Sequence, residues 1–187
     1  MRIIAGQFRG RRLLPPDTSA TRPITDRVKQ SLFDILSPRI EGAQVYDCFA
    51  GTGSMGLECL SRGCRFVTFF ESDRSALKRL RENLQALSLS GRGAVVPGDL
   101  MKWAQSAPPA QQPIDLIFLD PPYRMSVDDP QSLSKLTARL AAHHLVKSGI
   151  VIFRHDIQDN IELPALRRYD ARDYGPMRIE FLTHPEA

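Results

Sequence analysis

The stretch Leu-Asp-Pro-Pro-Tyr-Arg, at residues 119–124, places a carboxylate, two prolines and an aromatic ring directly after an apolar run. Neither Pro121 nor Pro122 has a backbone N–H to donate, so a strand in a sheet must end here. Asp120 supplies a carboxylate acceptor, and Pro121 supplies a carbonyl acceptor on a backbone with fixed φ. The candidate catalytic residues are therefore Asp120, Pro121, Pro122 and Tyr123.

Two acceptors side by side suit an exocyclic amino group on a nucleic acid base. The lone pair of that nitrogen is delocalised into the ring, so the nitrogen must pyramidalise before it can accept a methyl group. Two acceptors that hold its two N–H bonds would favour this geometry, and Tyr123 would stack on the base. A sulfonium methyl donor is already activated, so placement and electrostatics would suffice without a metal. The alternative interpretation is a structural corner that caps a helix.

A glycine-rich loop follows an earlier apolar run. Gly51, Gly53 and Gly56 fit the pattern G-x-G-x-x-G, which lets backbone approach a ligand at the start of a helix. By itself the pattern is typical of a nicotinamide dinucleotide site. Glu71, at the end of the next apolar run, would bind a ribose hydroxyl for either kind of nucleoside ligand.

Two further acids favour a ligand other than a dinucleotide. Asp47 precedes the glycine loop, where it would repel a pyrophosphate and attract an ammonium or sulfonium group. S-adenosylmethionine carries both cations and no phosphate. Asp99 offers an acceptor for an adenine amino group, although it could equally be a helix N-cap. The other candidate cofactor-binding residues beside these motifs are Phe49, Thr52, Ser72, Leu100 and, shared with the catalytic corner, Asp120.

The elements that must position these residues alternate between strand and helix. Strands are expected at residues 44–49, 65–71, 93–97, 114–120, 149–153 and 174–183. Helices are expected at residues 25–36, 54–62, 73–87, 100–105 and 133–145. This order predicts an α/β fold with a doubly wound, mostly parallel sheet, Rossmann-like in class. Ligands bind such sheets at the carboxyl ends of the strands, which is where the four acids fall.

Composition is that of a globular chain without a membrane span. The 187 residues are 42% hydrophobic and 25% charged, and the longest apolar runs have the length of strands. We see no secretory signal. Cys48, Cys59 and Cys64 show no C-x-x-C spacing, which favours reduced thiols in the cytoplasm and no metal site.

Charge is unevenly distributed along the chain. Residues 1–40 hold eight basic and three acidic groups, whereas residues 41–187 hold 17 basic and 18 acidic groups. We therefore expect a basic N-terminal arm and helix at 1–40 and a catalytic domain at 41–187. A basic arm on a near-neutral body indicates a polyanionic partner, although a solvated terminal segment would have the same composition.

Five segments together resemble one family of enzymes. They read RIIAGQFRGRRL, TRPITDRVKQSLFDIL, DCFAGTGSMGLECLSRG, DLIFLDPPY and DYGPMRIEF. The chain resembles the DPPY-motif amino-methyltransferases and, more closely, the RsmD-type bacterial enzymes that methylate a guanine N2 amino group in 16S ribosomal RNA. The resemblance implies S-adenosylmethionine as cofactor. It also implies RNA contacts from Arg9, Arg11, Arg22, Thr25 and Arg27. The segment FRHDIQDNIELP matches this family less well, because a carboxylate is commoner near Arg154 and His155.

The expected partner is 16S ribosomal RNA within a small-subunit assembly particle, with no membrane, no DNA and a monomeric chain. Three rival functions differ in kind. An adenine-N6 DNA methyltransferase shares DPPY, but it normally carries a separate target-recognition region for which 187 residues leave little room. A non-catalytic RNA-binding protein would not need intact DPPY and glycine-loop motifs. A nicotinamide-dependent oxidoreductase is disfavoured by Asp47 and by DPPY.

Overall fold

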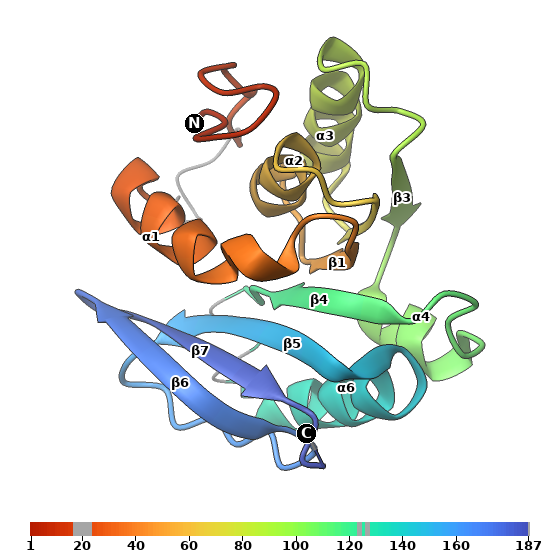
Figure 1. The fold of residues 1–187 in the computed structure, drawn as a ribbon. Helices are drawn as coiled ribbons and strands as arrows, with labels where there is room; N and C mark the ends of the chain where they lie inside the picture. Colours follow the sequence, from red (N-terminus) through yellow and green to blue (C-terminus); the bar gives the residue numbers. More distant parts are fainter. Residues whose placement is uncertain (17–23, 123–124, 126–127, 187) are drawn as a thin grey trace.

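The chain forms a single seven-stranded sheet with helices on both faces (Figure 1). The computed structural model describes residues 1–16, 24–122, 125 and 128–186. The strands are β1 (Gln44–Cys48), β2 (Phe66–Glu71), β3 (Gly93–Pro97), β4 (Ile114–Leu119), β5 (Leu145–Asp156), β6 (Arg167–Tyr174) and β7 (Met177–Thr183). Their order in the sheet is β3-β2-β1-β4-β5-β7-β6. The first five pair in parallel, and the β6–β7 hairpin adds to β5 in the antiparallel sense. The predicted fold class is confirmed.

The helices divide between the two faces of the sheet. They are α1 (Asp26–Leu36), the 3-10 turn η1 (Ser37–Arg39), α2 (Ser54–Ser61), α3 (Arg74–Ala86), α4 (Leu100–Ser106) and α6 (Pro130–His143). Figure 1 shows α1, α2 and α3 on one face and α4 and α6 on the other. Alternate strand residues supply the two cores: Val45 of β1 packs under α2 and α3, and its neighbour Tyr46 packs under α4. Two-sided burial explains why these strands are continuous apolar runs.

The carboxyl half of the sheet is more extensive than the sequence pattern indicates. β5 spans 12 residues, against five expected, and α6 begins at Pro130 with Asp129 as its N-cap. β6 was not predicted as a separate strand, because its sequence RRYDARDY is charged and largely exposed at the sheet edge. Gly175, at φ 62°, lies in the turn to β7, so the expected strand 174–183 is one arm of a hairpin.

The basic N-terminal segment is folded onto the domain. An isolated bridge pairs Arg2 with Arg12, which makes residues 2–12 a small hairpin. Ile3 and Leu13 are fully or nearly fully buried in the core beneath α1, α2 and α3. The N-terminal segment therefore contributes to the core as well as to the surface.

Candidate active site

Three carboxylates gather where β1, β2 and β4 end. β1 lies between the other two strands, and Cys48 pairs with Phe70 of β2 and with Leu119 of β4. Parallel register therefore brings Asp47, Glu71 and Asp120 to one edge of the sheet. Burial raises the pKa of Asp47 to about 8, and the charges of Asp120 and Glu71 add to this rise. A backbone hydrogen bond from Gly56 to Asp47, at 2.8 Å, opposes it. Such a site favours a cation.

The glycine loop between β1 and α2 is held by internal hydrogen bonds. Glu71 accepts the Gly51 N–H at 2.6 Å with one oxygen and the Ser72 and Asp73 N–H groups, both at 2.7 Å, with the other. The Ala50 and Gly53 amides also donate within the protein, to the carbonyls of Phe70 and Ala50. Glu71 therefore organises the loop, in addition to its expected contact with a ribose.

The three glycines of the motif have different structural roles. Gly51 has φ 56°, and a Cβ built there meets no atom within 4 Å, so this side of the loop is open. At Gly53, with φ 88°, a Cβ would lie 2.4 Å from Leu80 of α3. At Gly56 it would lie 2.3 Å from the ring of Phe69. Gly51 therefore borders open space, whereas Gly53 and Gly56 allow α2 to pack closely.

The Asp-Pro-Pro corner follows β4 as predicted. Pro121 is buried and Pro122 is exposed, and the Pro122 carbonyl accepts the Met125 N–H at 2.9 Å. Both oxygens of Asp120 meet the guanidinium of Arg154 from β5: Nε donates to Oδ1 at 2.7 Å, and Nη2 lies 2.6 Å from Oδ2. Burial raises the pKa of Asp120, and the Arg154 charge limits the rise. Tyr123 lies outside the described residues.

The remaining cofactor-binding candidates lie around the same edge. Asp99 is the N-cap of α4 and accepts the Met101 N–H at 2.8 Å, so its capping role is observed and an adenine contact stays a prediction. Leu100 and Thr52 are buried, and Ser72 is exposed. Phe49 has φ 62°, which is uncommon for a residue other than glycine, and it turns the chain out of β1.

The predicted RNA-binding residues differ in their surroundings. Arg9 and Arg27 are exposed, and Arg11 donates to the Ala86 carbonyl at the end of α3, at 3.0 Å. Thr25 is the N-cap of α1 and accepts the Val28 N–H at 3.3 Å, which gives it a structural role in addition to any RNA contact. Arg22 lies outside the described residues.

A buried ionic cluster beside the site was not predicted. Glu58 of α2 is completely buried, and its carboxylate accepts the Ile4 and Ala5 N–H groups at 2.8 and 3.0 Å. The same carboxylate pairs with Lys29 of α1 at 3.0 Å and with Arg62 at 2.9 Å. Burial lowers the pKa of Lys29, and Glu58 opposes this change. The sequence signal was available, since Lys29 shares helical spacing with the buried Leu32, Phe33 and Leu36.

Asn83 of α3 joins the N-terminal segment to the glycine loop. Its Oδ1 accepts the Leu14 N–H at 2.9 Å, and its Nδ2 donates to the Thr52 carbonyl at 3.0 Å. Asn83 is 3% exposed and interrupts the leucine stripe of its helix. Asn83 therefore links the basic segment to the glycine loop, and Glu58 links the same segment to α2.

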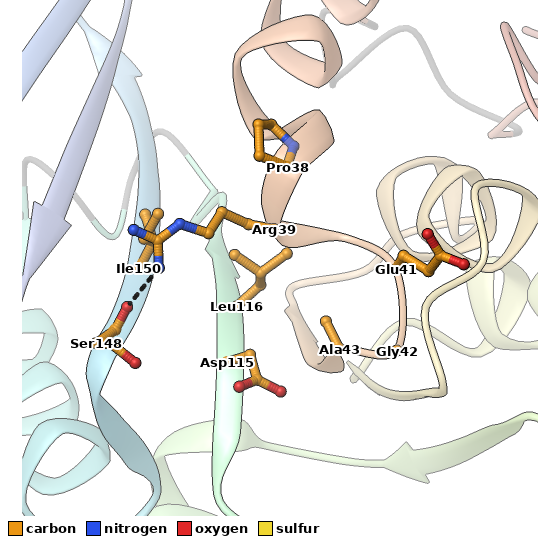
Figure 2. A pocket seen from close by; sticks show the side chains of 9 residues that line it. All are labelled: Pro38, Arg39, Glu41, Gly42, Ala43, Asp115, Leu116, Ser148 and Ile150. Atoms are coloured by element: carbon orange, nitrogen blue, oxygen red, sulfur yellow. Dashed lines mark hydrogen bonds between the residues drawn. The ribbon is translucent and has the colours of Figure 1, made fainter.

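A separate cavity of about 220 Å³ lies at the opposite edge of the sheet (Figure 2). It is bordered by the amino ends of β1, β4 and β5, where Arg39 donates to the Ser148 carbonyl at 3.4 Å and Asp115 lies nearby. In parallel α/β sheets ligands bind at the carboxyl edge, so this cavity is not the candidate active site. The described residues contain no group of His, Cys, Asp and Glu side chains that could hold a metal ion. Helices formed by these residues also lack the combined length and hydropathy of a membrane span.

Known proteins share both the sequence and the fold. "Ribosomal RNA small subunit methyltransferase D" of Haemophilus influenzae is 40% identical over 136 residues, which cover 73% of this chain and 70% of that protein. The protein of the same name from Escherichia coli K12 is 45% identical over 125 residues, 66% of this chain. That match spans 61% of the Escherichia coli protein, less than two thirds of its length.

A solved structure extends the likeness over nearly the whole chain. "Putative methyltransferase yhhF from Escherichia coli" is 31% identical, with a TM-score of 0.81, and the match covers 98% of this chain and 97% of that one. A family model described as "Conserved hypothetical protein 95" matches residues 1–183. The chain therefore belongs to the conserved hypothetical protein 95 family, the RsmD-type family whose motifs its sequence carries.

Proposed function

We propose that this chain transfers a methyl group from S-adenosylmethionine to the exocyclic N2 amino group of a guanine in 16S ribosomal RNA. The observation that carries the proposal is the convergence of Asp47, Glu71 and Asp120 at the carboxyl edge of β1, β2 and β4. The similar proteins of Escherichia coli and Haemophilus influenzae are named "Ribosomal RNA small subunit methyltransferase D", which supports methylation of small-subunit ribosomal RNA.

The residues at this edge fit S-adenosylmethionine better than a dinucleotide. A pyrophosphate needs free backbone N–H groups, yet the amides of Ala50, Gly51 and Gly53 already donate to protein oxygens. A bound ammonium or sulfonium would favour the ionised form of Asp47, whose pKa is raised to about 8, and would be attracted to it. Asp47 would attract these cations, Glu71 the ribose, and the open side of Gly51 would admit the ligand. When bound, the donor supplies a methyl group on an activated sulfonium.

The chain would act mainly by placing the target amino group. Asp120 and the Pro121 carbonyl would accept its two N–H bonds, which exposes the nitrogen lone pair. The proline ring fixes φ at Pro121 and so limits the freedom of this acceptor. Tyr123 would stack on the base once the base has left its own stack. Because these acceptors would already be oriented in a site that excludes much of the water, the protein and solvent would need little reorganisation during the reaction.

RNA would be held by the basic N-terminal surface. Arg9 and Arg27 are exposed, and the N-terminal segment that carries Arg9 is tied to α2 through Glu58 and to the glycine loop through Asn83. Exposed arginines suit phosphate contacts, which position RNA without reading its sequence. The substrate would be 16S ribosomal RNA in a small-subunit assembly particle, which places the reaction in the cytoplasm.

One experiment tests the reaction and the substrate together. Small-subunit particles from a strain that lacks the enzyme are incubated with labelled donor and the protein, and the modified base is mapped. We expect one labelled guanine carrying N2-methyl. Label on an adenine N6 of DNA, offered in the same assay, would instead support the rival DNA enzyme. RNA binding without any transfer would support a non-catalytic protein.

A further inference from the structure

We propose that Arg154 is a positioning residue of the methyl transfer: its guanidinium fixes the plane of the Asp120 carboxylate and keeps that carboxylate charged beneath the target amino group. The inference rests on the proposed function and extends it to a residue outside the Asp-Pro-Pro-Tyr motif.

The contact between the two side chains is a planar fork. Arg154 Nε donates to one oxygen of Asp120 at 2.7 Å, and Nη2 lies 2.6 Å from the other oxygen. Paired, bidentate contacts fix orientation as well as charge, which a lysine could not do. The two residues are 34 positions apart and meet because β4 and β5 are neighbours, with Leu119 opposite Phe153.

Asp120 still has acceptor capacity for a substrate. An ionised carboxylate offers about four lone-pair sites, and the two contacts with Arg154 use one on each oxygen. One site on each oxygen is left for the N–H of a target amino group. The Asp120 and Arg154 side chains are 29% and 20% exposed, so the pair lies at the surface of the site and substrate can reach it.

The other face of the pair is apolar. A void of about 10 Å³, close to the volume that one water molecule requires, lies beneath it. It is lined by α1, α2, β4, β5 and β7 through Leu32, Met55, Phe118, Leu119, Ile152 and Ile179. Without a cation, a carboxylate against such a surface would take up a proton and lose its strength as an acceptor.

Among the residues that the structure describes, few charged groups act on Asp120 from the neighbouring elements. The charge of Arg154, on β5, lowers the pKa of Asp120. The charge of Asp120 in turn raises the pKa of Asp47 on β1. Lys29 of α1 and Glu71 of β2 act on Asp47, and the apolar side chains of α1, α2 and β7 line the void. Within the described part of the chain, Arg154 is therefore the cation that acts on the charge of Asp120.

The test is the pH profile of single-turnover RNA methylation at saturating donor, which removes the titration of Asp47 from the profile. Arg154→Gln should shift the acid limb upward by about 1–3 pH units, since a neighbouring arginine lowers an aspartate pKa by that amount. Much of the lost rate should return at high pH. Arg154→Lys should keep the acid limb within about one unit and lower the rate at every pH, because charge is kept and the fork is lost.

Arg178→Met is the matched control. Arg178 forms another two-contact pair with an aspartate, Asp173, at 2.7 and 2.9 Å, but on the β6–β7 hairpin. It should leave the acid limb in place. Circular dichroism and donor affinity, measured for each variant, show that the fold and the donor site are intact.

Three results would overturn the inference. Arg154→Gln could keep the wild-type acid limb, it could be faster than wild type at neutral pH, or it could change only RNA affinity. The second result would make Arg154 a block on the site, and the third would make it an RNA contact. Wild-type protein that transfers no methyl group to ribosomal particles would instead contradict the proposed function itself.

Discussion

In the proposed reaction, the charged carboxylate of Asp120 accepts an N–H of the target amino group, and the apolar side chains beside Asp120 limit the access of water. We expect Asp120→Ala to lower single-turnover methyl transfer by about two orders of magnitude or more, the usual scale for one well-placed electrostatic partner. Donor affinity should change little, since the glycine loop and Glu71 are unaffected. The measurement is rapid-quench methylation, with calorimetry of donor binding in parallel.

Asp120→Asn is the control for that variant. The amide keeps a similar shape and one oxygen acceptor but loses the charge that pairs with Arg154. It should be impaired nearly as strongly as alanine. Near-normal turnover by Asp120→Ala would show that the Asp-Pro-Pro corner is structural and that the active site lies elsewhere.

Asp47 should make donor binding depend on pH. Its pKa of about 8 means that it carries a proton at neutral pH in the free protein, and a bound cation favours its release. Donor affinity should therefore rise from pH 6 to 8, by at most about tenfold per unit, and level off above. Calorimetry in buffers of different ionisation enthalpy measures the proton release.

Asp47→Asn separates this effect from titration of the donor. The α-amino group of the donor also titrates near pH 8, but it does so equally with both proteins. The asparagine oxygen can still accept the Gly56 N–H. If wild type and Asp47→Asn show the same pH dependence, Asp47 does not face the donor cation.

At the scale of elements, the N-terminal hairpin serves both the core and the surface. Deleting it would remove the buried Ile3 and Leu13 and would leave Glu58 without two of its donors, so truncation cannot isolate RNA binding. Single substitutions can separate the contribution of this hairpin to stability from its contribution to RNA binding. We expect Ile3→Ala to cost about 2–5 kcal/mol of unfolding free energy, with little effect on RNA affinity per folded molecule.

Arg9→Gln should have the opposite effect. Arg9 is exposed, so stability should stay within about 0.5 kcal/mol. RNA affinity should fall, and the slope of log affinity against log salt should become shallower by about one if a phosphate contact is lost. Filter binding over a salt series measures both. An unchanged slope would show that this part of the arm is only solvated surface.

The glycine loop provides a matched pair of substitutions. Gly51→Ala places a Cβ in open space and should cost about 1–2 kcal/mol through its positive φ. Gly53→Ala adds a clash with Leu80, and we expect about 1–3 kcal/mol beyond the same conformational cost. Urea unfolding gives both values. Relative to the loss of unfolding free energy, donor affinity should fall more in Gly51→Ala than in Gly53→Ala. Equal relative losses would contradict the proposal that the ligand lies beside Gly51.

At the scale of the whole molecule, the choice between nucleoside ligands should be visible in thermal stability. S-adenosylmethionine at 100 times its dissociation constant should stabilise the folded chain by about 2.7 kcal/mol and raise Tm, whereas NAD should not. Differential scanning calorimetry with each ligand makes the comparison. A rise in Tm with NAD and none with S-adenosylmethionine would overturn the cofactor assignment.

Local sequence patterns were sufficient to predict the fold class and to bring the candidate site residues to one edge of the sheet. Apolar runs of strand length alternating with helical stripes determined a doubly wound sheet, and that order alone brings Asp47, Glu71 and Asp120 together. The glycine pattern and the two prolines could be interpreted from a few adjacent residues alone. Their effects arise from the backbone angle φ and from missing N–H groups, which are local properties. β6 was not predicted, because an exposed strand at the sheet edge lacks the alternation of apolar and polar residues that indicates a strand.

Tertiary structure alone decided which polar groups are partners. Arg154 meets Asp120 across 34 positions, and Glu58 meets the N-terminal hairpin across 54, through strand order and helix packing that no local pattern specifies. The tertiary structure also distinguishes the roles of the glycines. The side chains of Leu80 and Phe69 reach Gly53 and Gly56 from other elements, so these two glycines serve packing, whereas Gly51 borders open space. The sequence determined the chemistry that is present, whereas the fold determined which groups hold it in place.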